Sequence, residues 1–221
     1  MIGVLISRKG IEKDMKKIIL FDWGNVLLNS DSEQYDIFKA RKDIISELNP
    51  GHPEILAKIF SDNDFWTTNG DRLSSLIEEY LRKSNCNHSV KEFKDCYLKH
   101  YYKVPWFEDT VSLFNKLVHD STISIGILSS LCEMDLELLK KRLDIKNIDY
   151  LFFTYEIGLQ KPDKRILDII EDVTKCIGKD ILYIDDKIEN INEAKKKHWD
   201  TVLATGHDIS LIKESCNIFK R

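Results

Sequence analysis

Four short stretches of this 221-residue chain end in side chains that could do chemistry. The first spans Lys17 to Asn29, where an apolar run stops at Asp22 and the turn-forming residues Gly24 and Asn25 follow. This pattern is typical of a buried strand that delivers a carboxylate at its tip. An open parallel sheet places its catalytic groups at such tips, although an aspartate there can also serve the turn itself. Asp22 is therefore a candidate catalytic residue.

The last of the four stretches, ILYIDDKIEN, repeats this logic. A strand predicted over Ile181–Ile184 delivers Asp185 and Asp186 at its end. Two adjacent carboxylates that face a third repel one another unless a cation or a proton lies among them. Hard oxygen ligands in this number suit Mg²⁺, which binds one or two carboxylates together with waters and a substrate phosphate. The sequence therefore predicts a Mg²⁺ site.

The two middle stretches supply hydroxyl groups and a cation. A strand predicted over Ile123–Leu128 leads into Ser129 and Ser130, which brings hydroxyls and backbone N–H groups to the same edge of the sheet. Lys161 stands directly before Pro162, which we expect at the first position of a helix. A lysine fixed beside a helix N-terminus can anchor an anionic group. Serines in turns and solvated lysines are common, so it is their position that makes these residues candidates.

The elements that must position these side chains alternate regularly in the second half of the chain. Short β runs and helices follow one another, which predicts right-handed βαβ crossovers and a parallel sheet covered on both faces. The predicted strands and helices there are Phe107–His119, Ile123–Leu128, Asp135–Leu143, Tyr150–Phe153, Asp163–Val173, Ile181–Ile184, Glu189–Lys197, Thr201–Ala204 and Asp208–Phe219. The predicted fold class is α/β, with a Rossmann-like parallel sheet as its core.

Between the first strand and this core the pattern is helical throughout. Apolar residues recur at helical spacing in Gln34–Leu48, Pro53–Phe60, Asp71–Lys83 and Val90–Tyr101. We therefore expect residues 15–30 and 105–221 to form the core, and residues 31–104 to form an inserted helical cap domain. Met15 could itself begin the first strand, so we interpret residues 1–14 as an N-terminal extension outside the fold.

A polar, turn-rich segment of the cap, residues 61–71, contains the neighbouring aromatics Phe65 and Trp66. Aromatic side chains dominate small cores, so filling the centre of the helical bundle is the favoured role of this pair. The alternative is that one of them, together with Asn69, lines a substrate pocket, and Trp66 is our candidate for that position.

Composition bounds the class of protein. The chain is 43% hydrophobic and 32% charged, values that are typical of an ordinary globular protein. Its net charge is −4, so it lacks the overall positive charge that would attract nucleic acid. Its five cysteines are odd in number and lack a CxxC pair, which favours a reducing cytoplasm over a disulfide framework. No run approaches the roughly 20 apolar residues of a membrane span. We expect no nucleic-acid or membrane partner, and the sequence leaves the oligomeric state open.

The stretches FDWGNVLL, ILSS, GLQKPD and YIDDKIENI, in this order and with a helical insert after the first, resemble the haloacid dehalogenase-like (HAD) superfamily of hydrolases over residues 16–215. The FDxGNV form with a terminal DDxxxN is most similar to its small sugar-phosphatase-like branch. That branch includes the glucose-1-phosphate phosphatase type and resembles the amino-terminal domain of soluble epoxide hydrolase. The resemblance implies a Mg²⁺-dependent phosphatase that acts on a small phosphorylated metabolite, with a sugar phosphate as one candidate.

The resemblance also implies a role for each site residue. Asp22 would be the nucleophile that takes the phosphoryl group as an aspartyl-phosphate. The remaining implied roles are Mg²⁺ binding by Asp22, the carbonyl of Gly24 and Asp186, an indirect metal contact through water for Asp185, support of the metal site by Asn190, and phosphate binding by Ser129 and Lys161. Apart from the resemblance, Ser130 and Trp66 are our candidates for further substrate contacts.

The chain departs from the superfamily pattern in ways that leave two alternatives open. Phosphatases of this superfamily usually carry a second aspartate two residues after the nucleophile, as general acid and base, where this chain and its closest branch have Gly24. An inactive HAD-fold binding or regulatory module is therefore one alternative. The other is a haloacid dehalogenase, which needs no metal and is disfavoured by Asp185 and Asp186. Ser130 and His198 also differ from the branch, which often has asparagine and glycine there.

Overall fold

The sheet at the centre of the fold forms from the apolar strands that the sequence predicts. The computed structural model describes residues 5–6 and 17–221, and in this part of the chain six strands form one sheet in the order β1-β4-β3-β2-β5-β6. They are β1 (Leu5–Ile6), β2 (Ile18–Phe21), β3 (Ser124–Ser129), β4 (Tyr150–Phe153), β5 (Ile181–Asp185) and β6 (Asp200–Leu203). Strands β2 to β6 are parallel. The predicted α/β class and parallel core are confirmed.

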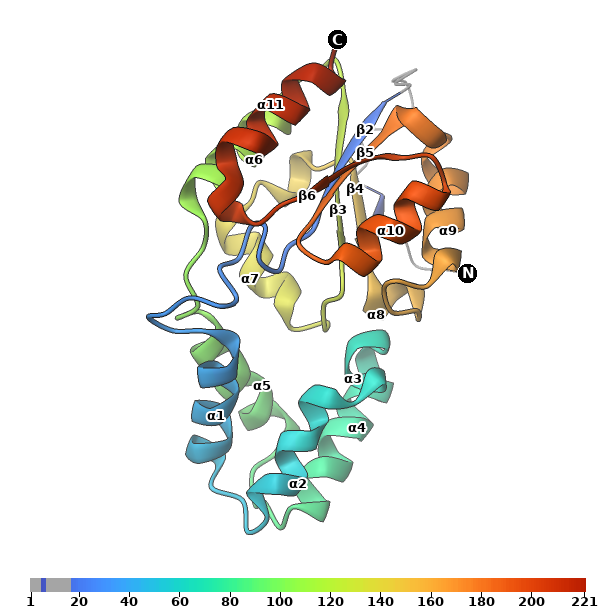
Figure 1. Cartoon of the computed structure of the whole chain (residues 1–221). Coiled ribbons are helices and arrows are strands. Elements are labelled where there is room, and N and C mark those ends of the chain that lie inside the picture. The colour runs from blue at the N-terminus through green and yellow to red at the C-terminus, as the bar shows by residue number, and fades with distance from the viewer. Residues whose placement is uncertain (1–4, 7–16) are drawn as a thin grey trace.

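Helices cover both faces of this sheet (Figure 1). The helices of the core are α6 (Glu108–Leu117), α7 (Asp135–Arg142), α8 (Thr154–Ile157), α9 (Lys164–Thr174), α10 (Ile188–Lys196) and α11 (Ile209–Phe219). In strand β2, the side chains of Ile19 and Phe21 belong to the apolar cluster on the face covered by α6, α7 and α11. The side chains of Ile18 and Leu20 belong to a second apolar cluster, on the opposite face, with α9 and α10. Because both faces are covered, the strand is apolar at every position.

The edge of the sheet differs from the prediction. Leu5 and Ile6, which we expected outside the fold, pair antiparallel with Leu151 and Tyr150 of β4. An edge strand leaves backbone N–H and C=O groups unpaired, and two residues of the extension supply partners for them. The other residues predicted to form the extension, 1–4 and 7–14, lie outside the described residues.

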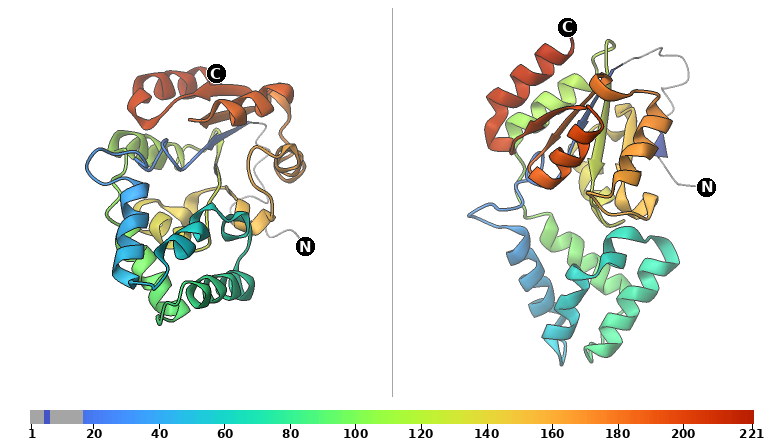
Figure 2. Two further views of the ribbon diagram at one scale, coloured as in Figure 1. Left: turned by 60° about the horizontal axis from the view of Figure 1, so that its bottom comes forward. Right: turned by 45° about the vertical axis from the view of Figure 1, so that its right-hand side comes forward.

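A body of helices lies over the carboxyl ends of the strands (Figures 1 and 2). It is formed by α1 (Ile37–Leu48), α2 (Pro53–Ala57), the 3₁₀ turn η1 (Lys58–Ser61), α3 (Asn63–Thr67), α4 (Gly70–Lys83) and α5 (Val90–Tyr101), which we call the cap. Its helices are amphipathic, as α4 shows by burying Leu73, Ile77 and Leu81 along one stripe. A capping box of Ser89 and Glu92 fixes the start of α5.

Two short helices that the sequence does not predict join the cap to the core. Helix α3 of the cap packs against α8 of the core, where the Thr154 hydroxyl donates to the carbonyl of Trp66 over 2.7 Å. At a second contact, the hydroxyl of Tyr97 in α5 donates to Oδ1 of Asp135 in α7, also over 2.7 Å. Helices α3 and α8 have only five and four residues, too few for a helical period to be visible in the sequence.

Two strands extend one residue further than predicted, and both added residues belong to the site. Ser129 pairs with Phe153 and ends β3, and Asp185 pairs with Leu203 and ends β5. The neighbouring strand continues the hydrogen-bonded pairing in each case, which the polar residue type does not reveal.

Every helix within residues 5–6 and 17–221 is too short or too polar to cross a lipid bilayer.

Candidate active site

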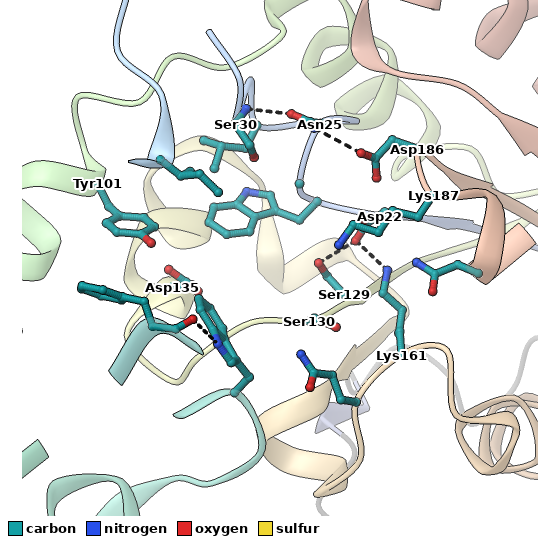
Figure 3. A pocket seen from close by; sticks show the side chains of 18 of the residues that line it. Asp22, Asn25, Ser30, Tyr101, Ser129, Ser130, Asp135, Lys161, Asp186 and Lys187 are labelled. Atoms are coloured by element: carbon teal, nitrogen blue, oxygen red, sulfur yellow. Dashed lines mark hydrogen bonds and ion pairs between the residues drawn. The ribbon is translucent and has the colours of Figure 1, made fainter. Parts of the chain in front are cut away.

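The predicted site residues lie together at the carboxyl ends of the parallel strands. Phe21 of β2 is in register with Ile127 of β3 and Ile184 of β5, so the residues that follow reach the same level. A cavity of about 340 Å³ separates these strand ends from the cap, and Figure 3 shows it from close by. Of the predicted site residues, all but Asp185 line it, namely Asp22, Gly24, Trp66, Ser129, Ser130, Lys161, Asp186 and Asn190.

The two oxygens of the Asp22 carboxylate have different surroundings. Asp22 is 5% exposed, and its Oδ1 accepts a hydrogen bond from Ser129 Oγ over 2.6 Å and lies 2.9 Å from Lys161 Nζ. Its Oδ2 has no hydrogen-bond partner among the described residues. Burial raises the pKa of Asp22 to about 6 against the opposing effects of Lys161 and Ser129. One oxygen is thus held in place, and the other is available to a ligand.

Lys161 is the cation that organises the centre of the site. Its side chain is 7% exposed, and Nζ lies 2.9 Å from Asp22 Oδ1 and 2.8 Å from Asp185 Oδ2. Nζ also donates to the carbonyl of Leu128 over 3.2 Å and to the hydroxyl of Tyr183 over 3.0 Å. Burial disfavours the charged amine, but the two carboxylates outweigh it and raise the pKa of Lys161. The side chain is therefore a fixed positive charge.

The segment that carries Lys161 differs from the prediction. Helix α9 begins at Lys164, so Pro162 is not its first residue, and the Lys161–Pro162 peptide bond is cis. Asp163 is the N-cap, because its side chain accepts a hydrogen bond from the backbone N–H of Arg165. Lys161 is consequently held by carboxylates and a strand carbonyl, and the helix N-terminus does not position it.

Asp185 is the most enclosed carboxylate of the site, with no exposed surface. Its Oδ1 accepts from the backbone N–H of Lys187 over 2.8 Å, and Asn190 Nδ2 lies 3.0 Å from both of its oxygens. Its Oδ2 accepts from Lys161 and from the hydroxyl of Tyr183. Burial opposes the charge, but Lys161 and the other donors outweigh it and lower the pKa of Asp185. Both oxygens are thus already engaged.

Asp186, the next residue, is open to the cavity. Its Oδ2 accepts a hydrogen bond from Asn25 Nδ2 over 3.1 Å, and its Oδ1 has no partner among the described residues. Asn25 has a φ of 56° in the left-handed region, which asparagine tolerates better than most residues, and its own Oδ1 accepts from the backbone N–H of Ser30. Burial raises the pKa of Asp186. The second free carboxylate oxygen of the site therefore belongs to Asp186.

The carboxylates fit a divalent cation. One carboxylate oxygen each of Asp22, Asp185 and Asp186 lies within 4.8 Å of the other two. Lys161 and Lys187 supply two positive charges against three carboxylates, so the cluster keeps an excess of negative charge that a divalent cation would neutralise. The free Oδ2 of Asp22 and Oδ1 of Asp186 are hard oxygen ligands of the kind that Mg²⁺ takes, and Gly24 lines the same cavity. Asp185 has no free oxygen to offer.

The remaining predicted positions divide between cavity and core. Ser130 and Trp66 both line the cavity, and the indole N–H of Trp66 donates to a backbone carbonyl of the cap. Phe65 is fully buried in the cap and fills its core, as the favoured interpretation has it. Asn69 donates to a backbone carbonyl of the core and does not line the cavity. His198 follows α10 with a φ of 62°, a left-handed conformation that glycine adopts more readily than other residues.

Sequence reasoning missed three residues of the site. Tyr183 lies two positions before Asp185 in β5 and so faces the same side of the sheet, a relation that the alternation of a strand could have revealed. Asn25 was treated only as a turn residue, although its side chain orients Asp186. Arg41 of α1 lines the cap side of the cavity, and nothing in the helical pattern separates it from the other cationic residues of the cap.

The family comparison matches most of the chain. Residues 19–204 match the family described as haloacid dehalogenase-like hydrolase. No curated protein sequence matches this chain.

Solved structures share the fold at low sequence identity. A HAD family enzyme from Bacteroides thetaiotaomicron, crystallised with magnesium and inorganic phosphate, has a TM-score of 0.66 at 17% identity, over 86% of this chain and 94% of that one. A protein described as a predicted HAD-like family hydrolase from Porphyromonas gingivalis has a TM-score of 0.62 at 17% identity, over 87% and 92%. The 2-haloacid dehalogenase from Pseudomonas syringae pv. tomato DC3000 has a TM-score of 0.58 at 15% identity, over 85% of each chain.

Proposed function

The chain belongs to the haloacid dehalogenase-like hydrolase family, and on this basis we propose that it is a Mg²⁺-dependent phosphatase that hydrolyses a small phosphomonoester through an aspartyl-phosphate. One observation carries the proposal above the others. The Asp22 carboxylate is fixed through one oxygen by Ser129 and Lys161, its other oxygen has no partner among the described residues, and Asp186 has a carboxylate oxygen within 4.8 Å of an Asp22 oxygen. A nucleophile and a metal ligand thus meet at one point of the cavity.

In the proposed first step, Oδ2 of Asp22 attacks the phosphorus atom, the bond from phosphorus to the alcohol oxygen breaks, and the alkoxide takes a proton from water. In the second step, water attacks the phosphorus of the aspartyl-phosphate. The bond to Asp22 then breaks, a proton passes to solvent, and inorganic phosphate leaves with the carboxylate restored. Covalent catalysis of this kind divides one difficult displacement into two easier ones.

The other residues supply orientation and charge. Ser129 and Lys161 hold Oδ1 of Asp22, which leaves Oδ2 directed toward the substrate, and both are positioned to bind phosphate oxygens. Asp185 accepts a hydrogen bond from Lys161 and so holds it in place, and Asn190 in turn donates to Asp185. Mg²⁺, bound by Asp22, Asp186 and the carbonyl of Gly24, would offset the negative charges of nucleophile and phosphate. The HAD enzyme of Bacteroides thetaiotaomicron was crystallised with magnesium and inorganic phosphate, which supports this ligand pair.

Gly24 bears on which esters are good substrates. A second aspartate at this position would protonate the leaving alcohol, a contribution of roughly 10² to 10⁴ in rate. Without it, we expect esters with more acidic leaving groups to react fastest. A Cβ at Gly24 would meet Ser30 Oγ at 3.6 Å, an ordinary contact, so the backbone does not itself require glycine for space there.

A second candidate is a haloacid dehalogenase, because solved dehalogenases share this fold. In that reaction the same carboxylate attacks carbon and displaces a halide, with no need for a cation. The accessible oxygen of Asp186 beside Asp22 favours the phosphatase. Chloride release from a 2-haloacid in the presence of a chelator would reverse this order.

The test is phosphate release from a panel of phosphate esters, with Mg²⁺ and with a chelator. We expect release with Mg²⁺ and a loss of at least about 10³-fold in Asp22→Asn, since removal of a nucleophile abolishes most of the rate. Asp71→Asn changes an exposed aspartate of the cap in the same way and should retain activity. No release from any ester by the folded protein with Mg²⁺ would contradict the proposal. It would favour the inactive binding module.

A further inference from the structure

We propose that the substrate carries a second anionic group, a carboxylate or a second phosphate, on its alcohol part, and that Arg41 of the cap binds this group. The inference rests on the proposed phosphatase function and deepens it by naming a class of substrate. It starts from the position of Arg41, which lines the same cavity as Asp22 but comes from helix α1, on the cap side.

The cap side of the cavity is an aromatic wall. Phe60, Trp66 and Tyr101 line it together with Arg41. Figure 3 shows Tyr101 and Asp135 across the cavity from Asp22 and Lys161. A phosphate bound at Asp22 therefore directs the rest of its ester toward this wall, and the leaving alcohol meets Arg41.

Packing fixes the guanidinium of Arg41. Its central carbon lies 5.3 Å from the ring centroid of Phe60, 5.5 Å from that of Trp66 and 5.8 Å from that of Phe38. Its Nε donates to the hydroxyl of Tyr101 over 3.1 Å. Stacking on ring faces holds the planar group while its outer edge stays available. Arg41 is therefore a preorganised cation.

The outer edge of this guanidinium has donors to spare. Neither terminal nitrogen of Arg41 has a hydrogen-bond partner among residues 5–6 and 17–221. Two parallel N–H groups match a carboxylate or phosphate in bidentate geometry. A neutral hydroxyl would accept only one of them. The unused donors consequently favour an anionic acceptor.

Asp135 is a buried acid whose charge acts on Arg41, but it does not supply the hydrogen-bond acceptor. Asp135 lines the cavity, but its Oδ1 accepts from the hydroxyl of Tyr97 and its Oδ2 from the backbone N–H of Cys132. It makes no hydrogen bond to Arg41 in the described structure. At the other end of the cavity, Lys161 lies beside Asp22 and is assigned to the reacting phosphate, and Lys187 acts on Asp186. Arg41 is thus left to bind a charge that the substrate brings.

The experiment measures binding, with phosphonates that cannot be hydrolysed. Methylphosphonate carries one anionic group and reports on the Asp22 end alone. Phosphonoacetate and its longer homologues add a carboxylate, and alkylene bisphosphonates add a second phosphonate. With Mg²⁺, calorimetric titration of the wild-type protein should show at least one doubly anionic ligand binding about 10-fold or more tightly than methylphosphonate, as expected for ionic hydrogen bonds. Which series binds tighter identifies the carboxylate or the phosphate as the second group.

Variants separate recognition from structure. In Arg41→Gln the preference for the doubly anionic ligand should vanish, and Arg41→Lys should keep part of it, because it retains the charge but loses the planar fork. Lys42→Gln, which removes an exposed cation from the same helix, should keep the full preference. An equal loss of affinity for methylphosphonate and the doubly anionic ligands in Arg41→Gln would assign Arg41 a structural role and overturn the inference.

Failure of this inference and failure of the proposed function give different results. If methylphosphonate binds and the wild-type protein shows no preference for any doubly anionic ligand, the inference is wrong and the phosphatase proposal stands. If no phosphonate binds and no ester is hydrolysed, both are wrong.

Discussion

The two ends of the cavity are stabilised by different interactions. At the core end, Lys161 and Asp185 form a buried network of ionic hydrogen bonds with Asp22, Tyr183 and Asn190. At the cap end, the cation is Arg41, whose guanidinium is held by aromatic ring faces and by one hydrogen bond. The core residues stand on neighbouring strands whose register fixes their separation. The cap residues stand on helices that meet the core through short contacts.

This difference separates chemistry from selectivity. Transition-state stabilisation requires charges that do not move when the reaction occurs, and the strand ends provide them. The alcohol part of a substrate can be recognised by any set of side chains that faces the strand ends. A cap made of amphipathic helices can therefore change its lining residues without disturbing the nucleophile. The predictions below test whether the two ends are independent in this way.

The largest effect is expected from Lys161→Met, which removes the cation of the core end. Asp22 and Asp185 would be left buried without the cation that they share, so the free energy of unfolding should fall by about 3–5 kcal/mol in the absence of Mg²⁺. Activity should fall by roughly 10²- to 10³-fold with the loss of one charge-stabilising donor. Chemical denaturation and ester hydrolysis measure the two effects.

Lys164→Met, at an exposed position three residues later, is the matched control and should change neither quantity. A Lys161→Met protein as stable as the wild type would show that this network does not hold the core end together.

An intermediate effect concerns the contact between cap and core at Asp135. Burial raises its pKa from 3.8 to about 6, so the folded protein holds the proton more tightly than the unfolded chain does. Stability from this group is full below about pH 4 and is lost as the pH rises through about 6. Relative to Asp135→Asn, the wild type should lose about 2–3 kcal/mol across this window. Denaturation of both proteins at several pH values measures the difference.

Asp22 titrates in the same range, but it is present in both proteins and cancels in the comparison. A difference between wild type and Asp135→Asn that stays constant from about pH 4 to 7 would mean that Asp135 is not buried at a closed interface.

The smallest effect is expected from Gly24→Asp, which adds a proton donor to the core end. Because a Cβ at Gly24 would make only an ordinary contact with Ser30 Oγ, we expect hydrolysis of esters with poor leaving groups to rise about 10-fold, less than a well-placed acid provides. Gly24→Asn has the same size and no acid, so it should give no gain. A gain of equal size in both variants, or one confined to esters with good leaving groups, would argue against a missing general acid.

Much of the core end could be predicted from the sequence. Apolar runs that stop at Asp22, Ser129 and Asp185 mark strand ends, and parallel strands bring such ends to one edge. The different surroundings of Asp185 and Asp186 could not be predicted. Whether a carboxylate is enclosed or open depends on which side of the strand end it faces and on the donors of β5 and α10.

The cap end was largely beyond sequence reasoning. The periodic helices α1, α4 and α5 were recognisable, but α3 and α8, which dock the cap, are too short to show a period. Arg41 has the sequence context of any exposed helical arginine, and only the packing of Phe60 and Trp66 around it shows that it faces the cavity. Leu5 and Ile6 pair with the edge of β4, and no local sequence pattern predicts that this edge is open to a further strand.

The central claim is that Asp22 attacks phosphorus, and the most direct measurement is to find the phosphoryl group on it. Protein mixed with a hydrolysable ester and Mg²⁺ is quenched in acid within one turnover, digested, and analysed by mass spectrometry. We predict that the peptide containing Asp22 carries one phosphoryl group, which disappears on treatment with hydroxylamine, as an acyl phosphate must. A phosphoryl group on Ser129, or turnover with no phosphorylated peptide at any time point, would contradict the mechanism.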